Sequence, residues 1–139
     1  MYRQVSYEHH LTTSRICYQQ SLIVHISGFR VFATARSTQT LSGLADMGIE
    51  TLSLEVTQTD SIAEAKREIN ERTGGKLDFL VNNAGRSYTV PALDIDIEEV
   101  RQTFETNVFA VMRMCQAFAP LLIEAKGTIV QIGSLAGVM

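Results

Sequence analysis

Polar residues follow the apolar runs of this chain at points where they could take part in chemistry. A tight turn, Asn82–Gly85 (Asn-Asn-Ala-Gly), comes directly after the apolar run Leu77 to Val81. Asn107 and Ser134 follow at separations that allow one helix and one further strand between them. Open α/β sheets bind cofactors in the crevice at the carboxyl ends of their strands. The turn therefore predicts a cofactor site, and its glycine, which lacks a Cβ, lets the backbone approach a ligand closely.

Arg36 closes an earlier run, Arg30 to Ala35, with no carboxylate beside it. In a dinucleotide-binding fold, an acidic side chain at this point hydrogen bonds the ribose 2′-hydroxyl, whereas an arginine pairs with a 2′-phosphate. Arg36 thus favours NADP(H). A solvated arginine at a strand end is the alternative, and the turn downstream makes the cofactor role the better interpretation.

From Arg30 onward, short β-branched and aromatic runs alternate with helical patterns, which is typical of βαβ units and a mostly parallel sheet. We expect strands at Arg30 to Ala35, Glu50 to Val56, Leu77 to Val81 and Thr128 to Ile132. We expect a short helix at Thr40 to Met47, a helix opened by a Ser61/Glu64 capping box and closed at Gly74, and a long helix after Asp96 and Glu99 whose apolar residues repeat over Val100–Leu122.

The first 27 residues do not fit this plan. They show no clear helical period, and only Leu22 to Ile26 resembles a strand. That run cannot be a parallel neighbour of Arg30 to Ala35, because a parallel connection needs a crossover of about a dozen residues. We therefore expect residues 1–27 to be a tail, a helix remnant or a hairpin strand, and residues 28–139 to form a partial nucleotide-binding domain.

Size and composition exclude several classes of function. The chain has 139 residues, 45% of them hydrophobic and 19% charged, which is typical of one soluble globular domain. Its net charge of −3 gives no basic surface for binding nucleic acid. Cys17 and Cys115 have no metal-ligand spacing, and His9, His10 and His25 match no recognised metal site. No signal peptide or membrane span is evident, so we expect a cytoplasmic protein with reduced thiols.

The Asn-Asn-Ala-Gly turn, Asn107 and Ser134 together resemble the classical short-chain dehydrogenase/reductase (SDR) family. The resemblance implies that Asn82, Ala84 and Gly85 lie along the cofactor. It also implies that Asn107 supports a water in a proton relay and that Ser134 hydrogen bonds a substrate carbonyl.

A further pair, Glu55-Val56, stands where that family usually has Asp-Val or Asp-Leu packed on the adenine. The longer Glu55 carboxylate can still accept a hydrogen bond from the adenine amino group. The resemblance therefore assigns both residues to the cofactor site.

Two signatures of the family are missing from the sequence. No Gly-x-x-x-Gly-x-Gly precedes Arg30, and none of Tyr2, Tyr7, Tyr18 and Tyr88 has a lysine four residues later. The family uses such a Tyr-Lys pair to protonate the alkoxide that hydride transfer leaves. We therefore expect a partial Rossmann-like, doubly wound α/β sheet with helices on both faces, its first and last strands missing, and an isolated chain that does not turn over.

Two segments, Gly28 to Arg36 and Arg86 to Asp94, look most like the fungal NADPH-dependent 1-acyldihydroxyacetone-phosphate reductases. That resemblance implies reduction of the ketone of an acylated lipid phosphate in glycerolipid synthesis, at the endoplasmic reticulum or lipid droplets. A steroid or retinoid reductase of the same family is the nearest alternative. An alternative of a different class is a non-catalytic module that docks on a reductase subunit, or on a second copy as a homo-oligomer, through its Val100–Leu122 helix.

Overall fold

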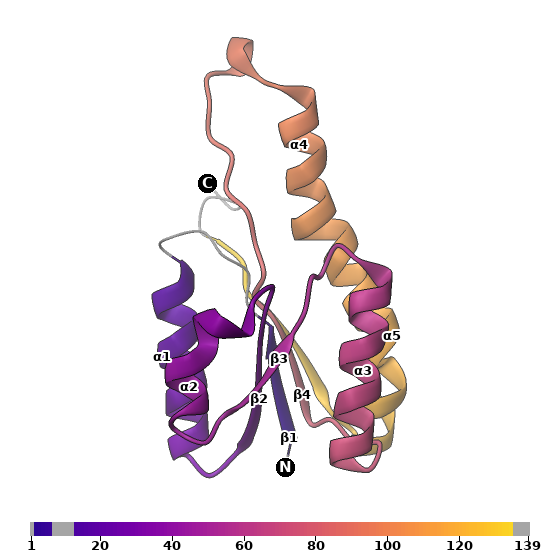
Figure 1. Ribbon diagram of the computed structural model, residues 1–139. Helices are drawn as coiled ribbons and strands as arrows, with labels where there is room; N and C mark the ends of the chain where they lie inside the picture. The colour runs from indigo at the N-terminus through magenta and orange to yellow at the C-terminus, as the bar shows by residue number, and fades with distance from the viewer. Residues whose placement is uncertain (1, 7–12, 135–139) are drawn as a thin grey trace.

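A single parallel sheet forms the centre of the molecule, which the computed structural model describes over residues 2–6 and 13–134 (Figure 1). Its five strands lie in the order β3-β2-β1-β4-β5, and every pair in that order is parallel. The strands are β1 (Tyr2–Ser6), β2 (Arg30–Ala35), β3 (Glu50–Ser53), β4 (Phe79–Asn82) and β5 (Thr128–Gln131). The predicted α/β fold with a doubly wound sheet is confirmed.

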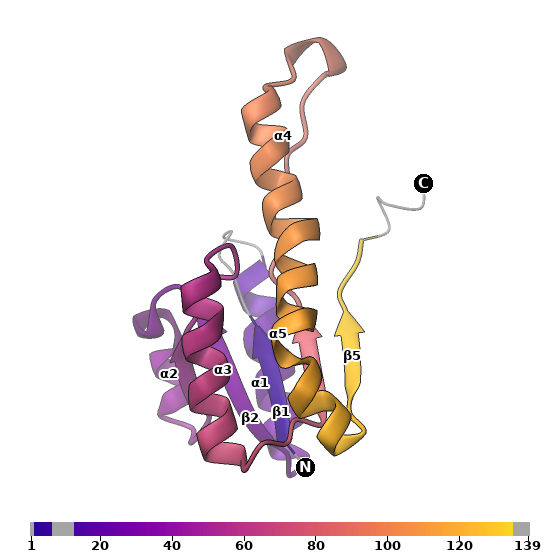
Figure 2. The same cartoon turned by 90° about the vertical axis from the view of Figure 1, so that its right-hand side faces the viewer.

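Helices cover both faces of the sheet, as predicted (Figure 1). One face carries α1 (Thr13–Ile26), the short helix η1 (Thr38–Leu41) and α2 (Ser42–Ala45). The opposite face carries α3 (Thr59–Thr73) and α5 (Ala110–Ala125). Between β4 and α5, the chain forms η2 (Ala92–Asp94), α4 (Ile97–Phe104) and the π-helical segment η3 (Glu105–Phe109), and the loop before α4 projects well beyond the sheet (Figure 2).

The two faces of the sheet bury two separate clusters because side chains alternate along a strand. Phe32 packs with α3 and α5 in one cluster, which also holds Ile69, Met114 and Phe118. Val31, Ala33 and Ala35 point to the other face, where Leu44 of α2 joins them. Strands buried on both faces read as nearly continuous apolar runs, which is why β2 and β4 could be predicted.

The expectation that the first strand is missing is wrong. Tyr2–Ser6 forms β1 at the centre of the sheet, in register with β2 on one side and β4 on the other. Arg3, Gln4 and Ser6 hid this strand, because a central parallel strand is expected to be apolar. Backbone pairing on both sides places it there, where its absence would leave β2 and β4 with open edges.

The description of residues 1–27 as a tail also needs correction. Of the three alternatives, the helix is the one found: Leu22 to Ile26 is the end of α1, not a strand. Because α1 carries the chain back across the sheet, it is the crossover that a parallel connection from β1 to β2 requires. Residues 7–12, between β1 and α1, lie outside the described residues.

The predicted helix ends are partly confirmed. Asp96 caps α4, accepting a hydrogen bond from the Glu98 N–H at 2.8 Å, and Gly74 ends α3 in the left-handed conformation. The Ser61/Glu64 capping box is wrong, since α3 begins two residues earlier, at Thr59. The Ser61 hydroxyl instead accepts a hydrogen bond from the Glu55 N–H at 2.9 Å.

The long helix Ile97–Ala125 contains a window that we had not expected. Over 18 residues its mean hydropathy is 1.5, so by length and composition alone it could cross a membrane. Core helices of globular proteins pass the same test, and here Met114, Phe118 and Leu122 are buried against the sheet and α3. The absence of a membrane-spanning segment stays a prediction.

Candidate cofactor-binding site

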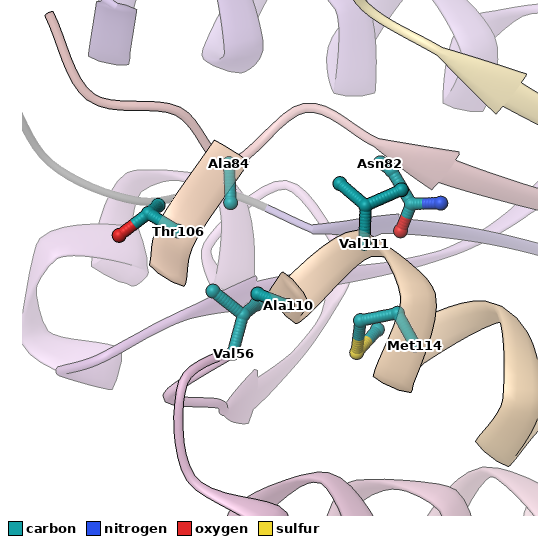
Figure 3. A pocket seen from close by; sticks show the side chains of 7 residues that line it. All are labelled: Val56, Asn82, Ala84, Thr106, Ala110, Val111 and Met114. Atoms are coloured by element: carbon teal, nitrogen blue, oxygen red, sulfur yellow. The ribbon is translucent and has the colours of Figure 1, made fainter. Parts of the chain in front are cut away.

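A small pocket lies where the carboxyl ends of the strands meet the long helix (Figure 3). Val56, from the loop after β3, lines one side, and Asn82 and Ala84, from the end of β4, line another. The remaining lining residues all come from the long helix: Thr106, Ala110, Val111 and Met114. The structure therefore brings together three of the residues predicted for the cofactor.

Asn82 is buried and ties three elements together beneath the turn. Its side-chain Nδ2 donates to the Cys115 Sγ of α5 at 3.5 Å, and its carbonyl accepts from the Ile132 N–H, beyond β5, at 3.0 Å. The Cys115 Sγ also accepts from the Gln131 Nε2 at 3.6 Å. Asn82 thus joins the start of the turn to α5 through its side chain and to the chain beyond β5 through its backbone.

Asn107 lies in the π-helical segment and holds the residue that follows the turn. Its Oδ1 accepts from the Arg86 N–H at 2.8 Å, and its Nδ2 donates to the Arg86 carbonyl at 2.9 Å. A π-helical turn inside an α-helix is rare and is often found at functional sites. The sequence predicted a special role for this asparagine but not the π-helix around it.

Gly85 is not required by the packing of the chain itself. A Cβ built at this position meets the Asn107 Oδ1 at 3.7 Å and the Asn83 carbonyl at 3.8 Å, both ordinary contacts. Its φ does not lie in the left-handed region that favours glycine. The absence of a side chain at this position therefore leaves room for something other than the chain's own atoms.

Glu55 and Val56 behave differently from each other. Val56 is buried and lines the pocket, as predicted. The Glu55 Oε1 accepts hydrogen bonds from the Thr57 N–H at 3.1 Å and from the Thr57 hydroxyl at 2.7 Å. At least one carboxylate oxygen of Glu55 therefore stabilises its own turn, and a contact between Glu55 and an adenine stays a prediction.

Arg36 follows β2, with its side chain exposed at the same edge of the sheet. Its carbonyl accepts a hydrogen bond from the Ser53 hydroxyl, at the end of β3, at 3.3 Å. The neighbouring strand β1 ends at Ser6, which pairs with both Thr34 and Asn82. This shared register places Arg36 and the turn at one edge, with β1 between them.

Ser134 lies three residues beyond β5 and is exposed. It belongs to the same edge of the sheet, but neither it nor Asn107 lines the pocket. The pocket therefore brings together three of the predicted cofactor residues and neither of the two predicted catalytic residues.

Comparison with known proteins decides the family. A family model described as short chain dehydrogenase matches residues 16–139. The chain belongs to the short chain dehydrogenase family.

Two curated fungal proteins are similar to this chain. A short-chain dehydrogenase of Talaromyces islandicus is 46% identical over 118 residues, which cover 84% of this chain and 42% of that protein. The NADPH-dependent 1-acyldihydroxyacetone phosphate reductase of Schizosaccharomyces pombe is 44% identical over 115 residues, covering 83% of this chain and 39% of that protein. This chain therefore spans about two fifths of the length of these curated relatives.

Solved structures of the family share the fold. A short-chain dehydrogenase from Streptomyces avermitilis superposes with a TM-score of 0.86 at 29% identity, covering 99% of this chain and 51% of that one. A metagenomic short-chain oxidoreductase solved in complex with NADP has a TM-score of 0.81 at 29% identity, covering 99% of this chain and 63% of that one. The family's fold is thus present here over the part that these proteins have in common.

The contribution of the long helix to the pocket was missed from the sequence. We interpreted its methionine and phenylalanine stripe as core packing, which is correct for Phe118 and Leu122. It is wrong for Phe104 and Met112, which are 53% and 56% exposed. Thr106, Ala110, Val111 and Met114 recur at helical spacing, and the small residue Ala110 leaves space beside Val56. A small residue within a stripe of large ones is the signal that could have revealed the pocket.

The residues around the pocket fit the adenosine end of a family cofactor. Small-molecule sites are concave and mostly apolar, with a few polar groups that fix orientation, and this pocket has apolar walls with only Asn82 and Thr106 as polar members. Val56 and Ala84 suit the face of an aromatic base, and Arg36 suits a 2′-phosphate. For the pyrophosphate the sequence offers no glycine before Gly28.

A metal centre has no comparable support. Over the described ranges, no group of three or more His, Cys, Asp or Glu side chains is placed to hold a metal ion.

Proposed function

We propose that this chain is the NADP(H)-binding part of an oxidoreductase that reduces a ketone to an alcohol. The observation that carries the proposal is the pocket where Val56, Asn82 and Ala84 meet the long helix at the carboxyl edge of the sheet. The chain's family and the position of Arg36 support it. The names of two similar proteins, an NADPH-dependent reductase and an NADP complex, agree with this cofactor.

Each residue has a distinct part in this proposal. When bound, NADPH supplies the hydride. Val56 and Ala84 pack against its base, Arg36 pairs with its 2′-phosphate, and Ser134 donates a hydrogen bond to the substrate carbonyl. Asn107 supports a water in the proton relay, as the family resemblance implies.

The cofactor preference can be tested with Arg36→Ala. A hydrogen bond to a charged group contributes about 1.5–3 kcal/mol, so we expect NADPH binding to weaken by roughly tenfold or more while NADH binding stays unchanged. The measurement is a titration of the ¹⁵N-labelled chain with each nucleotide, followed by NMR. Arg67→Ala, which removes an exposed arginine from the outer face of α3, is the matched control. Equal weakening for both nucleotides, or none for NADPH, would contradict the assignment.

For the substrate we propose 1-acyldihydroxyacetone phosphate, supported by the similarity to the S. pombe reductase. The proposed setting is glycerolipid synthesis at the endoplasmic reticulum or lipid droplets. The isolated chain should not turn over, because none of its tyrosines has the lysine partner that the family's proton donor uses.

A chimera tests whether this segment supports reduction of that substrate. Residues 28–139 should replace the matching segment of the S. pombe reductase without loss of NADPH oxidation on the acylated substrate. A chimera that folds and binds NADPH but reduces a steroid ketone in preference would favour the alternative within the family.

A second candidate role is self-association through the Val100–Leu122 helix. Phe104, Phe109 and Met112 on and beside the π-helical segment are 53%, 46% and 56% exposed, which is unusual for large apolar side chains so close together. Sedimentation should detect a dimer that Phe104→Glu disperses. Open strand edges give no reason for docking, because β1 fills the position between β2 and β4.

A further inference from the structure

Arg86 is bound to the long helix from two directions at once. Its backbone N–H and carbonyl are both held by the Asn107 side chain. Its guanidinium donates through one nitrogen to the Glu99 carboxylate and through the other to the Gln102 amide oxygen. These partners are spaced along α4 and the π-helical segment, so one residue of the β4–α4 connection contacts more than two turns of helix.

The double attachment of Arg86 also holds the Asn82–Gly85 turn, because Arg86 is next to that turn in the chain. It directly follows Gly85, the last residue of the turn that contributes Asn82 and Ala84 to the pocket. It also opens the projecting loop that leads to α4 (Figure 2). Any movement of Arg86 relative to the helix therefore moves the turn relative to Thr106 and Ala110 on the other wall of the pocket.

The base of the projecting loop has a second attachment. The Tyr88 hydroxyl accepts a hydrogen bond from the Asp96 N–H at 2.9 Å, which joins the segment that leaves the sheet to the segment that returns to α4. Beyond this point the loop is largely exposed, with Leu93 at its tip 99% exposed. Arg86 and Tyr88 thus attach the base of the loop, next to the turn, whereas its outer part is exposed.

We propose that Arg86 is a positioning residue, whose guanidinium, bound to α4, holds the Asn82–Gly85 turn against the long helix so that the pocket accepts its nucleotide. The inference deepens the proposed function and rests on it for the identity of the ligand. Arginine suits this role because its planar fork can bind two acceptors in a fixed geometry, which the single ammonium of a lysine cannot do.

The ion pair between Arg86 and Glu99 differs from the surface ion pairs of the chain in its surroundings. The Arg86 side chain is 22% exposed and joins the β4–α4 connection to α4, 13 to 16 residues further along the chain. Arg67 likewise binds two side-chain acceptors, the carboxylates of Glu64 and Glu71, but its side chain is 56% exposed and all three residues lie on α3. Arg67 therefore supplies a control in which the same chemistry is lost without any change between elements.

The test compares Arg86→Met with Arg67→Met in the full chain, with NADPH as the probe. We expect Arg86→Met to weaken NADPH binding about tenfold and Arg67→Met to leave it unchanged. Arg86→Lys, which keeps the charge and one donor, should fall between the wild type and Arg86→Met. This variant also serves if Arg86→Met does not fold.

A double-mutant cycle with Asn107→Ala shows whether the two attachments act on one turn. If they do, Arg86→Met adds less than about twofold to the loss caused by Asn107→Ala, because the turn is already released. Effects that multiply independently, or an Arg86→Met variant that binds NADPH as tightly as Arg67→Met, would overturn the proposal.

A second readout does not depend on the nucleotide. The Asn107 side-chain NH₂ should show slow hydrogen exchange and a distinct NMR signal in the wild type, and Arg86→Met should lose both while Arg67→Met keeps them. A wild type that binds no NADPH would refute the proposed function, yet this signal would still decide whether Arg86 positions the turn. An unchanged Asn107 signal in Arg86→Met would refute the positioning role alone.

Discussion

At the scale of single residues, the turn after β4 combines a tightly bonded asparagine with a glycine that the chain does not need. Asn82 is buried and bonded to Cys115 and to the backbone beyond β5. Gly85 has only ordinary contacts around the position of a Cβ. One residue fixes the turn and the other keeps its surface open, which is the arrangement that a nucleotide approaching the backbone requires.

Gly85→Ala separates these two effects. We expect the free energy of unfolding to stay the same or rise by about 0.4–1 kcal/mol, since an alanine fits the native backbone here and restricts the unfolded chain. NADPH binding should weaken by about tenfold, because crowding a close contact costs about 1–3 kcal/mol. Urea denaturation and an NADPH titration of one preparation measure both quantities. A variant that loses stability as well as binding would show that the glycine serves the fold.

Single residues also show what the sequence could and could not predict about the site. Asn82 and Ala84 were predictable because their turn comes directly after a buried run, where parallel sheets bind ligands, and Val56 was assigned by the family resemblance. The attachment of Glu55 to Thr57 and the π-helix around Asn107 were not predictable. Both depend on hydrogen bonds whose geometry appears only once the neighbouring segments are in place.

At the scale of elements, backbone segments approach each other closely at the junction between α5 and β5. A Cβ on Gly127 would lie 2.4 Å from the Leu77 carbonyl and 2.8 Å from that of Asp78. The backbone is also bonded here, with the Thr128 N–H donating to the Asp78 carbonyl at 2.7 Å. The glycine was expected to break the helix before the last strand, but the close approach of two backbones is its stronger requirement.

Gly127→Ala should therefore destabilise the chain by about 1–3 kcal/mol, because the neighbouring atoms are backbone and cannot rotate away. Gly133→Ala, where a Cβ meets nothing within 4 Å, is the matched control and should be nearly neutral. Urea denaturation of both variants gives the comparison. Equal unfolding midpoints would mean that β5 can move away from β4 at little cost.

At the amino ends of β2 and β3, an ion-pair network joins these two strands to the end of α3. Arg30 binds the Glu50 carboxylate through its Nε and its Nη2. The Arg72 Nη1 lies 3.3 Å from the Oε2 of the same carboxylate. Hydrogen bonding from Arg30 lowers the pKa of Glu50 below its ordinary value of 4.5, although burial opposes this shift. The remaining causes, the charges of Arg30 and Arg72 and the hydrogen bond from Arg72, also lower the pKa of Glu50.

This shift predicts part of the acid sensitivity of the fold. Because the folded pKa of Glu50 lies below its unfolded value, the stabilisation is complete above 4.5 and is lost as the pH falls through the folded pKa. At neutral pH, Glu50→Gln should cost less than about 1 kcal/mol, since the network is partly exposed. The difference between wild type and variant should shrink as the pH falls below 4.5, in urea denaturation at stepped pH. A constant difference down to strong acid would contradict the role of this carboxylate.

At the scale of the whole molecule, β1 connects the two sides of the candidate site. Ser6 pairs with Thr34 of β2, two residues before Arg36, and also with Asn82 at the start of the turn. The strand order and the helices on both faces follow from the alternation of apolar runs and could be predicted. β1 could not, because Arg3, Gln4 and Ser6 give it the composition of a surface segment, and only pairing with two neighbours identifies it.

Gln4→Pro tests this central strand, since Gln4 pairs with Phe32 on one side and Leu80 on the other. Proline removes a backbone donor in the middle of a sheet and leaves a carbonyl without its partner, which should cost about 1–3 kcal/mol, whereas Gln4→Ala should change little. NADPH binding should weaken in the same variant, because β1 sets the separation between Arg36 and the turn. If urea denaturation gave the two variants the same midpoint, Tyr2–Ser6 would not be the central strand that pairs with β2 and β4.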